Sequence, residues 1–121
     1  MINKHILIVE DNPDNYELAD KIIKHMGYQT TIITNGIETL EWCAKNTPDL
    51  ILMDISIPNK DGLEVAKELR TNPNFNNIPI VALTAHAMKG DEDKAIEAGC
   101  TKYMSKPFRP AELKSMIGSL I

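Results

Sequence analysis

The segment Asp49–Asp54 reads DLILMD and places four consecutive apolar residues between two aspartates. Two other segments have the same character: His5–Glu10 reads HILIVE, and Ile78–Thr84 reads IPIVALT. Nearly continuous apolar runs of this length are typical of strands that are buried on both faces of a parallel sheet. The weaker segments Tyr28–Ile33 and Thr101–Met104 carry polar residues, so we expect them to form the edge strands of the same sheet.

Segments of helical periodicity alternate with these strands. The predicted helices contain the apolar groups Leu18, Ile22 and Met26; Ile37, Leu40 and Ala44; Leu63, Ala66 and Leu69; Ala95 and Ala98; and Leu113, Met116, Ile117 and Leu120. Gly27 and Gly99 stand where C-terminal helix caps are expected, and Pro110 stands just inside the last helix. Each strand is therefore followed by a helix, which is the pattern of an α/β fold.

Five strand–helix units predict a doubly wound (βα)5 sandwich of three layers with a flavodoxin-like parallel sheet. With strands 1, 3 and 4 in the centre and strands 2 and 5 at the edges, the predicted strand order is 2-1-3-4-5. The winding reverses between strands 1 and 3, and ligands of such sheets bind at the carboxyl ends of the strands beside the reversal. Functional residues are therefore expected directly after Val9 and near Asp54.

The composition limits the possible functions. The chain has 121 residues, with 13 Lys and Arg against 17 Asp and Glu, and a formal net charge of −4. This length predicts a single domain, residues 1–121, and the net negative charge does not favour nucleic acid or an anionic membrane as a partner. No apolar run approaches the roughly 20 residues of a membrane span, and no signal peptide is evident. Cys43 and Cys100 are expected to be small buried groups rather than a disulfide framework, so we expect a cytoplasmic domain.

Acidic residues gather where the first and third predicted strands end. Glu10 and Asp11 follow the first strand, and Asp54 ends the third. A lone aspartate in such a place is usually a helix cap or an inert loop residue. Three carboxylates together repel one another, at a cost of about 4 kcal/mol per pair at 4 Å and an effective dielectric constant of 20. A divalent cation removes that repulsion, and oxygen ligands suit Mg²⁺ or Mn²⁺.

Two groups of different chemistry are expected at the same edge of the sheet. Thr84 ends the fourth strand, and Ser105, Lys106 and Pro107 follow the fifth. A carboxylate, a metal ion, a hydroxyl group and an ammonium group together are typical of a phosphoryl-transfer site. In this interpretation Asp54 is the nucleophile that forms an acyl phosphate, while Lys106 and Thr84 bind the phosphoryl oxygens. Lys106 taken alone would be interpreted as a solvated surface lysine.

Five short motifs follow one another along the whole chain: Ile8–Asn12 (IVEDN), Leu52–Ile55 (LMDI), Pro58 followed by Asp61 and Gly62, Ala82–Ala85 (ALTA), and Ser105–Pro107 (SKP). Together they resemble the receiver domain of two-component response regulators. The resemblance implies that Asp54 is the phosphoacceptor and takes its phosphoryl group from a phosphohistidine of a sensor kinase or a phosphotransfer protein. It also implies that Asp11, Asp54 and the backbone carbonyl of Ser56 ligate Mg²⁺, with Glu10 assisting through water.

The same resemblance implies a conformational switch. Thr84 and Tyr103 match the hydroxyl and aromatic positions that move together on phosphorylation. The face formed by the fourth helix, the fifth strand and the fifth helix would then change shape for a downstream protein. A cis peptide bond is implied between Lys106 and Pro107. Without the resemblance, Tyr103 would be an ordinary aromatic residue of an edge strand.

The sequence leaves several questions open. The chain is similar to stand-alone receivers of chemotaxis and cell-cycle phosphorelays, but the segment Ala85–Asp91 also resembles receivers that belong to hybrid histidine kinases. His86 is expected either at the surface or at the mouth of the site. Trp42 falls off the apolar face of its predicted helix, and it either covers a neighbouring side chain or belongs to a partner surface.

Two other classes of protein share parts of this pattern. A flavodoxin-type electron carrier would have the same fold, but Glu10–Asp14 (EDNPD) would repel the phosphate group of FMN. An aspartyl-phosphate phosphohydrolase would share the Asp, Thr and Lys residues, but it carries a second aspartate where this chain has Ser56. The sequence therefore favours a signalling switch over a turnover enzyme, and steady release of phosphate from small esters would reverse this preference.

Overall fold

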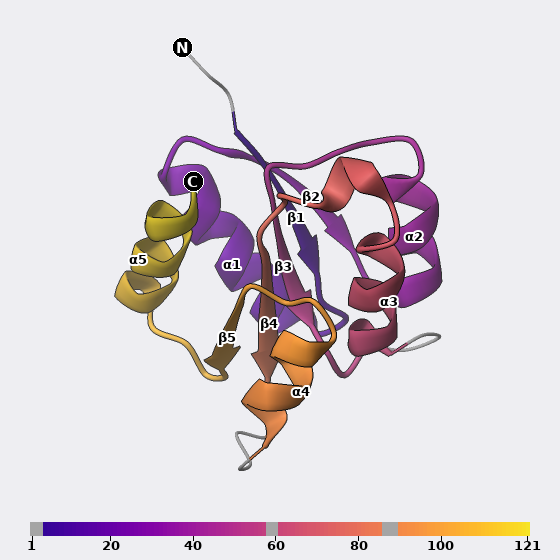
Figure 1. Cartoon of the computed structure of the whole chain (residues 1–121). Helices are drawn as coiled ribbons and strands as arrows, with labels where there is room; N and C mark the ends of the chain where they lie inside the picture. Colours follow the sequence, from indigo (N-terminus) through magenta and orange to yellow (C-terminus); the bar gives the residue numbers. More distant parts are fainter. Residues whose placement is uncertain (1–3, 58–60, 86–89) are drawn as a thin grey trace.

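The computed structural model describes residues 4–57, 61–85 and 90–121. Pro58 of the third motif and His86, with most of the segment around it, lie outside the described residues. In the described ranges, five strands alternate with five α-helices, and a short 3₁₀ helix precedes the fourth strand (Figure 1). The elements are β1 (His5–Val9), α1 (Pro13–His25), β2 (Gln29–Ile33), α2 (Gly36–Cys43), β3 (Leu50–Asp54), α3 (Gly62–Leu69), η1 (Pro73–Phe75), β4 (Ile80–Thr84), α4 (Asp91–Glu97), β5 (Lys102–Ser105) and α5 (Pro110–Leu120).

The strands form one parallel sheet in the order β2-β1-β3-β4-β5, which confirms the predicted fold class and winding. β3 and β4 consist entirely of buried residues, whereas β2 and β5 carry exposed ones, as predicted for central and edge strands. Each predicted strand is present, with ends that differ from the sequence prediction by two residues at most. The carboxyl ends of β1 and β3 lie side by side, because Val9 pairs with Met53.

Helices cover both faces of the sheet (Figure 1). α1 and α5 pack on one face, over a core cluster that includes Ile8 of β1 and Ile117 of α5. α2, α3 and α4 pack on the other face, over a cluster that includes Val9 of β1 and the ring of Phe75. Successive residues of β1 therefore point into opposite clusters, and both faces of a central strand must be apolar. This is the physical reason for the continuous apolar runs in the sequence.

The predicted apolar faces of α1 and α2 need correction. Leu18 of α1 is 41% exposed and Ile37 of α2 is 49% exposed, and Ala44 is exposed as well. Ile22 is buried as predicted, and Met26 and Leu40 pack partly buried against the core. The other buried residues are Ala19 and Ile23 in α1, and Gly36, Thr39 and Cys43 in α2. Small residues such as Ala19 and Gly36 belong to the helix faces that contact the sheet. Helical spacing alone does not distinguish such a face from the neighbouring face, which carries larger apolar residues.

Of the two alternatives left open for Trp42, the structure supports the first, that it covers neighbouring side chains. Its side chain is half-buried and packs against the cluster under α2 and α3. The centroid of its ring lies 5.7 Å from that of His5, and the His5 ring nitrogen lies 2.6 Å from the Thr31 hydroxyl. Trp42 thus covers neighbouring side chains at the amino-terminal end of the sheet, far along β1 from the acidic residues.

The predicted caps are confirmed. Gly27 and Gly99 have φ angles of 93° and 106°, the left-handed region that glycine adopts at helix C-termini. Pro110 is the first residue of α5, where its missing N–H group costs no hydrogen bond.

Both cysteines are buried and free, as predicted. Burial raises the pKa of the Cys43 thiol to about 12 and that of the Cys100 thiol to about 11, so neither forms a reactive thiolate at neutral pH. Among the helices in the described ranges, none is long and apolar enough to cross a membrane.

Candidate functional site

Three carboxylates meet at the carboxyl ends of β1 and β3. Glu10 directly follows β1, and Asp54 is the last residue of β3. One carboxylate oxygen from each of Glu10, Asp11 and Asp54 lies within 4.8 Å of the other two. Glu10 and Asp54 are buried, whereas Asp11 is exposed, so the group is closed on the protein side and open to solvent on the other. The sheet topology therefore brings together the acidic residues that the sequence singled out.

Asp11 is not used as the cap of the following helix. The side chain of Asn12 accepts a hydrogen bond of 3.0 Å from the backbone N–H of Asp14 and caps α1 in its place. Pro13 then starts the helix. Asn12 is therefore the capping residue, and the Asp11 carboxylate remains available at the open side of the cluster.

Lys106 supplies a positive charge to this cluster. Its Nζ lies 2.8 Å from Asp54 Oδ2 and 2.7 Å from Glu10 Oε2, and its side chain is only 11% exposed. Its backbone N–H donates a 2.7 Å hydrogen bond to the carbonyl of Thr84, which fixes the chain that leaves β5 against the end of β4. The Lys106–Pro107 peptide bond is cis. The interpretation of Lys106 as a solvated surface lysine is therefore wrong.

The electrostatics of the cluster follow from burial and from this contact. Burial raises the pKa of Glu10, and the nearby Asp54 adds to the rise, while Lys106 opposes it. Burial alone would lower the pKa of Lys106, but its hydrogen bonds to Asp54 and Glu10 outweigh that effect and raise it. The site thus holds one ammonium group and three carboxyl groups, and the local excess of negative charge favours a further cation.

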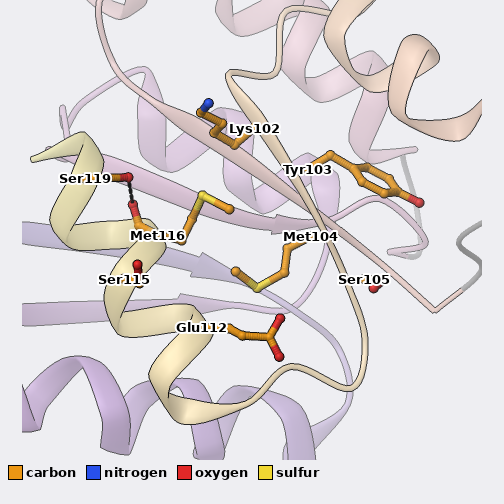
Figure 2. A pocket seen from close by; sticks show the side chains of 8 residues that line it. All are labelled: Lys102, Tyr103, Met104, Ser105, Glu112, Ser115, Met116 and Ser119. Atoms are coloured by element: carbon orange, nitrogen blue, oxygen red, sulfur yellow. Dashed lines mark hydrogen bonds between the residues drawn. The ribbon is translucent and has the colours of Figure 1, made fainter.

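The remaining candidates are Ser56, Thr84 and Tyr103. Ser56 is exposed, and its backbone N–H donates a 2.9 Å hydrogen bond to Asp54 Oδ1. Thr84 is the buried last residue of β4, the strand beside β3. Tyr103 lies on β5 with its ring against the core cluster on the α4 side and its phenol oxygen buried. Its ring points away from Met104 and the α5 side of the strand (Figure 2).

Sequence reasoning missed two features of the site. The backbone N–H of Asn12 and the side-chain amide of Asn15 donate to Glu10 Oε1 at 3.3 and 3.4 Å, so they orient its carboxylate. Gly62 belongs to one of the sequence motifs, but only the three-dimensional structure shows why a glycine is needed at this position. A Cβ at Gly62 would lie 2.7 Å from Ile55 Cα and 2.9 Å from the carbonyl oxygen of Asp54. The start of α3 can therefore approach the end of β3 only with glycine at this position.

The fold and this cluster define the class of protein. The model of the response regulator receiver domain matches residues 6–118, and the chain belongs to that family. Receiver domains are signalling components of two-component systems. In general they interact with histidine kinases and with downstream targets.

Individual relatives refine the comparison. The chain is 46% identical to the polar-differentiation response regulator DivK of Brucella anthropi, over 87% of this chain and 85% of that protein. It is 35% identical to the receiver domain of a sensor histidine kinase from Pseudomonas aeruginosa, with a TM-score of 0.90 over 98% of both chains. That receiver has a magnesium ion coordinated in its active-site cleft. A chemotaxis response regulator of Vibrio cholerae has a TM-score of 0.93 over 99% of this chain and all of its own, and at 23% identity it supports the fold alone.

Proposed function

We propose that this receiver is a phosphorylation-activated switch in which Asp54 accepts a phosphoryl group from a phosphohistidine of a sensor kinase or a phosphotransfer protein. One observation carries the proposal: the buried Asp54 carboxylate lies 2.8 Å from Lys106 Nζ, within a cluster that Asp11 leaves open to solvent. An acceptor of phosphoryl groups needs a nucleophilic oxygen beside groups that neutralise the incoming charge.

The donor set fits Mg²⁺ or Mn²⁺. Hard divalent cations take oxygen ligands and keep several waters, and the cluster offers carboxylate oxygens on an open side. We propose that Asp11, Asp54 and the backbone carbonyl of Ser56 hold the ion, with Glu10 acting through water. When bound, the ion would neutralise negative charge on the transferred phosphoryl group.

The proposed step conserves atoms and charge. One oxygen of Asp54 attacks the phosphorus atom, the P–N bond of the phosphohistidine breaks, and the bonding electron pair leaves with the imidazole ring. The product is an acyl phosphate on Asp54. Lys106 is then in reach of a phosphoryl oxygen, and Thr84 at the end of the neighbouring β4 is the proposed hydroxyl donor to another.

The residue at position 56 supports a switch over a turnover enzyme. Ser56 stands where an aspartyl-phosphate phosphohydrolase carries its acid/base aspartate, and a serine hydroxyl is a poor general base. The receiver would therefore catalyse its own phosphorylation and dephosphorylation without steady turnover of small substrates. A phosphorylated Asp54 would persist long enough to be recognised by a partner.

The output surface that we propose is the face formed by α4, β5 and α5. Thr84 would be drawn toward the phosphoryl group, and Tyr103 of β5 would move with it. These movements would shift the conformational equilibrium of this face. A surface pocket lies between β5 and α5, and Figure 2 shows the side chains of Met104 and Met116 across it from each other. Methionine side chains adapt to differently shaped partners, and the rim contains Lys102 and Glu112. These features support a protein partner at this face.

The proposal is tested by intact-protein mass after incubation with acetyl phosphate, with and without Mg²⁺. We expect a single phosphoryl adduct on the wild type that requires Mg²⁺ and is absent from Asp54→Asn. Asp14→Asn is a matched control, because Asp14 is an exposed aspartate of α1, and it should be phosphorylated like the wild type.

An adduct that persists in Asp54→Asn would exclude Asp54 as the acceptor. Absence of any adduct, together with steady release of phosphate, would favour the phosphohydrolase instead. Absence of both adduct and phosphate release would mean that the chain has the fold of a receiver without its chemistry.

A further inference from the structure

Lys106 holds two buried carboxylates at once. Its Nζ lies 2.8 Å from Asp54 Oδ2 and 2.7 Å from Glu10 Oε2. The side chain of Glu10 is 1% exposed and that of the lysine 11%, so water screens these contacts poorly. Among the ion pairs found in the described ranges, those with Lys106 are the only ones that Glu10 or Asp54 makes. The ammonium group is therefore the internal counter-ion of the two buried carboxylates.

The two carboxylate oxygens of Glu10 have different partners. Oε1 accepts from the backbone N–H of Asn12 at 3.3 Å and from the side-chain amide of Asn15 at 3.4 Å. Oε2 is buried and, apart from the Lys106 ammonium, has no hydrogen-bond donor among the described residues. The neighbours of Oε1 thus orient the carboxylate, and Oε2 depends on the lysine for its charge compensation.

The proposed cation site brings a second positive charge to the same oxygen. One carboxylate oxygen from each of Glu10, Asp11 and Asp54 lies within 4.8 Å of the other two. A divalent ion held by Asp11 and Asp54, with Glu10 acting through water, would direct a water hydrogen at Glu10. Oε1 already has two donors, so Oε2 is the oxygen expected to receive it. The ammonium group and the hydrated ion repel each other there, and burial limits the screening of that repulsion.

Asp54 is the partner that the lysine is expected to keep. Asp54 Oδ2 accepts from Lys106 at 2.8 Å, and Oδ1 accepts from the backbone N–H of Ser56 at 2.9 Å. An ion that binds Oδ1 would replace the Ser56 donor, and Ser56 is exposed, so its N–H group can bond to water instead. The lysine has no such exchange, because leaving both carboxylates would bury an uncompensated charge.

We propose that Lys106 and the divalent cation compete for Glu10 Oε2, and that binding of the cation releases the lysine from Glu10 while leaving it at Asp54. This inference rests on the metal site proposed above. By linkage, the lysine weakens cation binding by the same factor by which the cation weakens the contact between Lys106 and Glu10. The released ammonium group can then turn toward a phosphoryl oxygen on Asp54. The cation thus prepares the lysine for phosphoryl binding, in addition to neutralising charge.

The first test measures Mn²⁺ binding from the electron paramagnetic resonance signal of the unbound ion. Lys106→Met should bind Mn²⁺ at least about tenfold more tightly than the wild type, a change of about 1.4 kcal/mol. Lys106→Arg, which keeps the charge, and Lys102→Met, which removes an exposed lysine of β5, are matched controls that should bind like the wild type. In a Glu10→Gln background, the gain from Lys106→Met should fall to about threefold or less, because the contested carboxylate has lost its charge.

The second test uses the wild type, so it does not depend on the folding of Lys106→Met. NMR relaxation of the Lys106 ammonium nitrogen should show a more mobile side chain when Mg²⁺ is added to saturation, because the contact with Glu10 is lost. Asp11→Asn removes a proposed ligand of the ion, so the same concentration of Mg²⁺ should leave its Lys106 signal unchanged.

Equal Mn²⁺ affinities of the wild type and Lys106→Met would overturn the competition and leave the proposed metal site standing. So would a wild-type ammonium group whose mobility Mg²⁺ does not change. An equal gain in both backgrounds would overturn the role of Glu10, because the lysine would then act as a remote charge. Absence of Mn²⁺ binding from every variant would overturn the metal site and the competition together. Neither measurement needs a phosphoryl donor, so the result is independent of whether Asp54 is the acceptor.

Discussion

Lys106 places an ammonium group between the carboxylates of Glu10 and Asp54, at 2.7 and 2.8 Å. Both carboxylates are buried, so their repulsion is poorly screened by water. Removing one partner of a buried ion pair usually destabilises a protein more than the pair itself stabilises it, because a buried charge is left uncompensated. The lysine is therefore expected to support the fold of the metal-free site in addition to its proposed chemical role.

Lys106→Met should lower the free energy of unfolding in a pH-dependent way when a chelator is present. Loss of the ammonium group removes what opposes the raised pKa of Glu10, so that pKa rises further above its usual value. A carboxyl group with a raised folded-state pKa contributes stability below its unfolded-state pKa and loses it as the pH rises through the folded-state value. We expect a deficit of about 3 kcal/mol at pH 8 and a smaller one at pH 4.5, by urea denaturation.

The control for this prediction is Lys102→Met, which removes an exposed lysine from β5 and should change little. A deficit of equal size at both pH values would show that Lys106 acts through packing and not through charge.

Gly62→Ala should destabilise the protein by about 1–3 kcal/mol, the usual cost of an atom forced into a packed place. The new Cβ would lie 2.7 Å from Ile55 Cα and 2.9 Å from Asp54 O, and backbone atoms cannot move aside as a side chain can. Gly118→Ala in α5 is the matched control, because a Cβ there meets nothing within 4 Å. It should stabilise the helix by about 0.5–1 kcal/mol. Equal unfolding midpoints for the two variants would contradict the close approach of α3 to β3.

At the scale of elements, Arg70 connects the end of α3 to the nearby η1 and to the turn between α4 and β5, which is distant in the sequence. It follows α3, donates from Nε to the carbonyl of Gly99 at 2.9 Å, and donates from Nη1 to the carbonyl of Phe75. A third bond of 3.3 Å reaches the hydroxyl of Thr101. Burial lowers the pKa of this guanidinium, and the group satisfies carbonyls at the end of η1 and at the turn between α4 and β5.

Arg70→Ala should therefore cost about 2 kcal/mol. It should also speed exchange of the Thr101 amide hydrogen, because the Thr101 hydroxyl and the Gly99 carbonyl both lose their bond to the guanidinium group. Arg70→Lys should recover only part of this loss, since an ammonium group cannot reach several carbonyls with the planar geometry of arginine. Lys67→Ala, at an exposed position of the same helix, serves as the control. If Arg70→Lys unfolds like the wild type in urea, the forked geometry is unimportant.

The elements also show what the sequence can and cannot predict. The strands were predictable because both faces of β1, β3 and β4 are buried, which forces continuous apolar runs. The acidic cluster was predictable because parallel strands bring their carboxyl ends to one edge of the sheet. The orientation of α1 and α2 was not, because Ala19 and Thr39 belong to the buried rows and carry little hydrophobic signal. The contacts of Gly62 and Arg70 depend on distances between segments, which a periodic pattern does not contain.

At the scale of the whole molecule, the sheet separates two core clusters, one under α1 and α5 and one under α2, α3 and α4. The central strands contribute residues to both clusters, so the two sides are expected to unfold together. Trp42 is the single tryptophan of the chain, and it lies on the α2 side. Its fluorescence therefore reports on one cluster while circular dichroism reports on all helices.

Ile117→Ala tests this coupling from the opposite face. Ile117 of α5 is fully buried, and its truncation should cost about 3 kcal/mol. The unfolding midpoint measured by Trp42 fluorescence should fall as far as the midpoint measured by circular dichroism. Ser115→Ala, on the exposed side of the same helix, should move neither midpoint appreciably. Separate midpoints for the two probes would mean that the faces of the sheet unfold independently.

The acidic cluster and its lysine come from chain segments that are far apart, with Glu10 near the start and Lys106 near the end of the sequence. A ribosome makes these parts in order, and the lysine that neutralises the carboxylates emerges long after Glu10 and Asp54. A nascent or misfolded chain thus presents the carboxylates without their cation or their geometry. Under the proposed function it would not compete with finished molecules for a phosphoryl donor. Folding would thereby act as a check on which molecules take part in signalling.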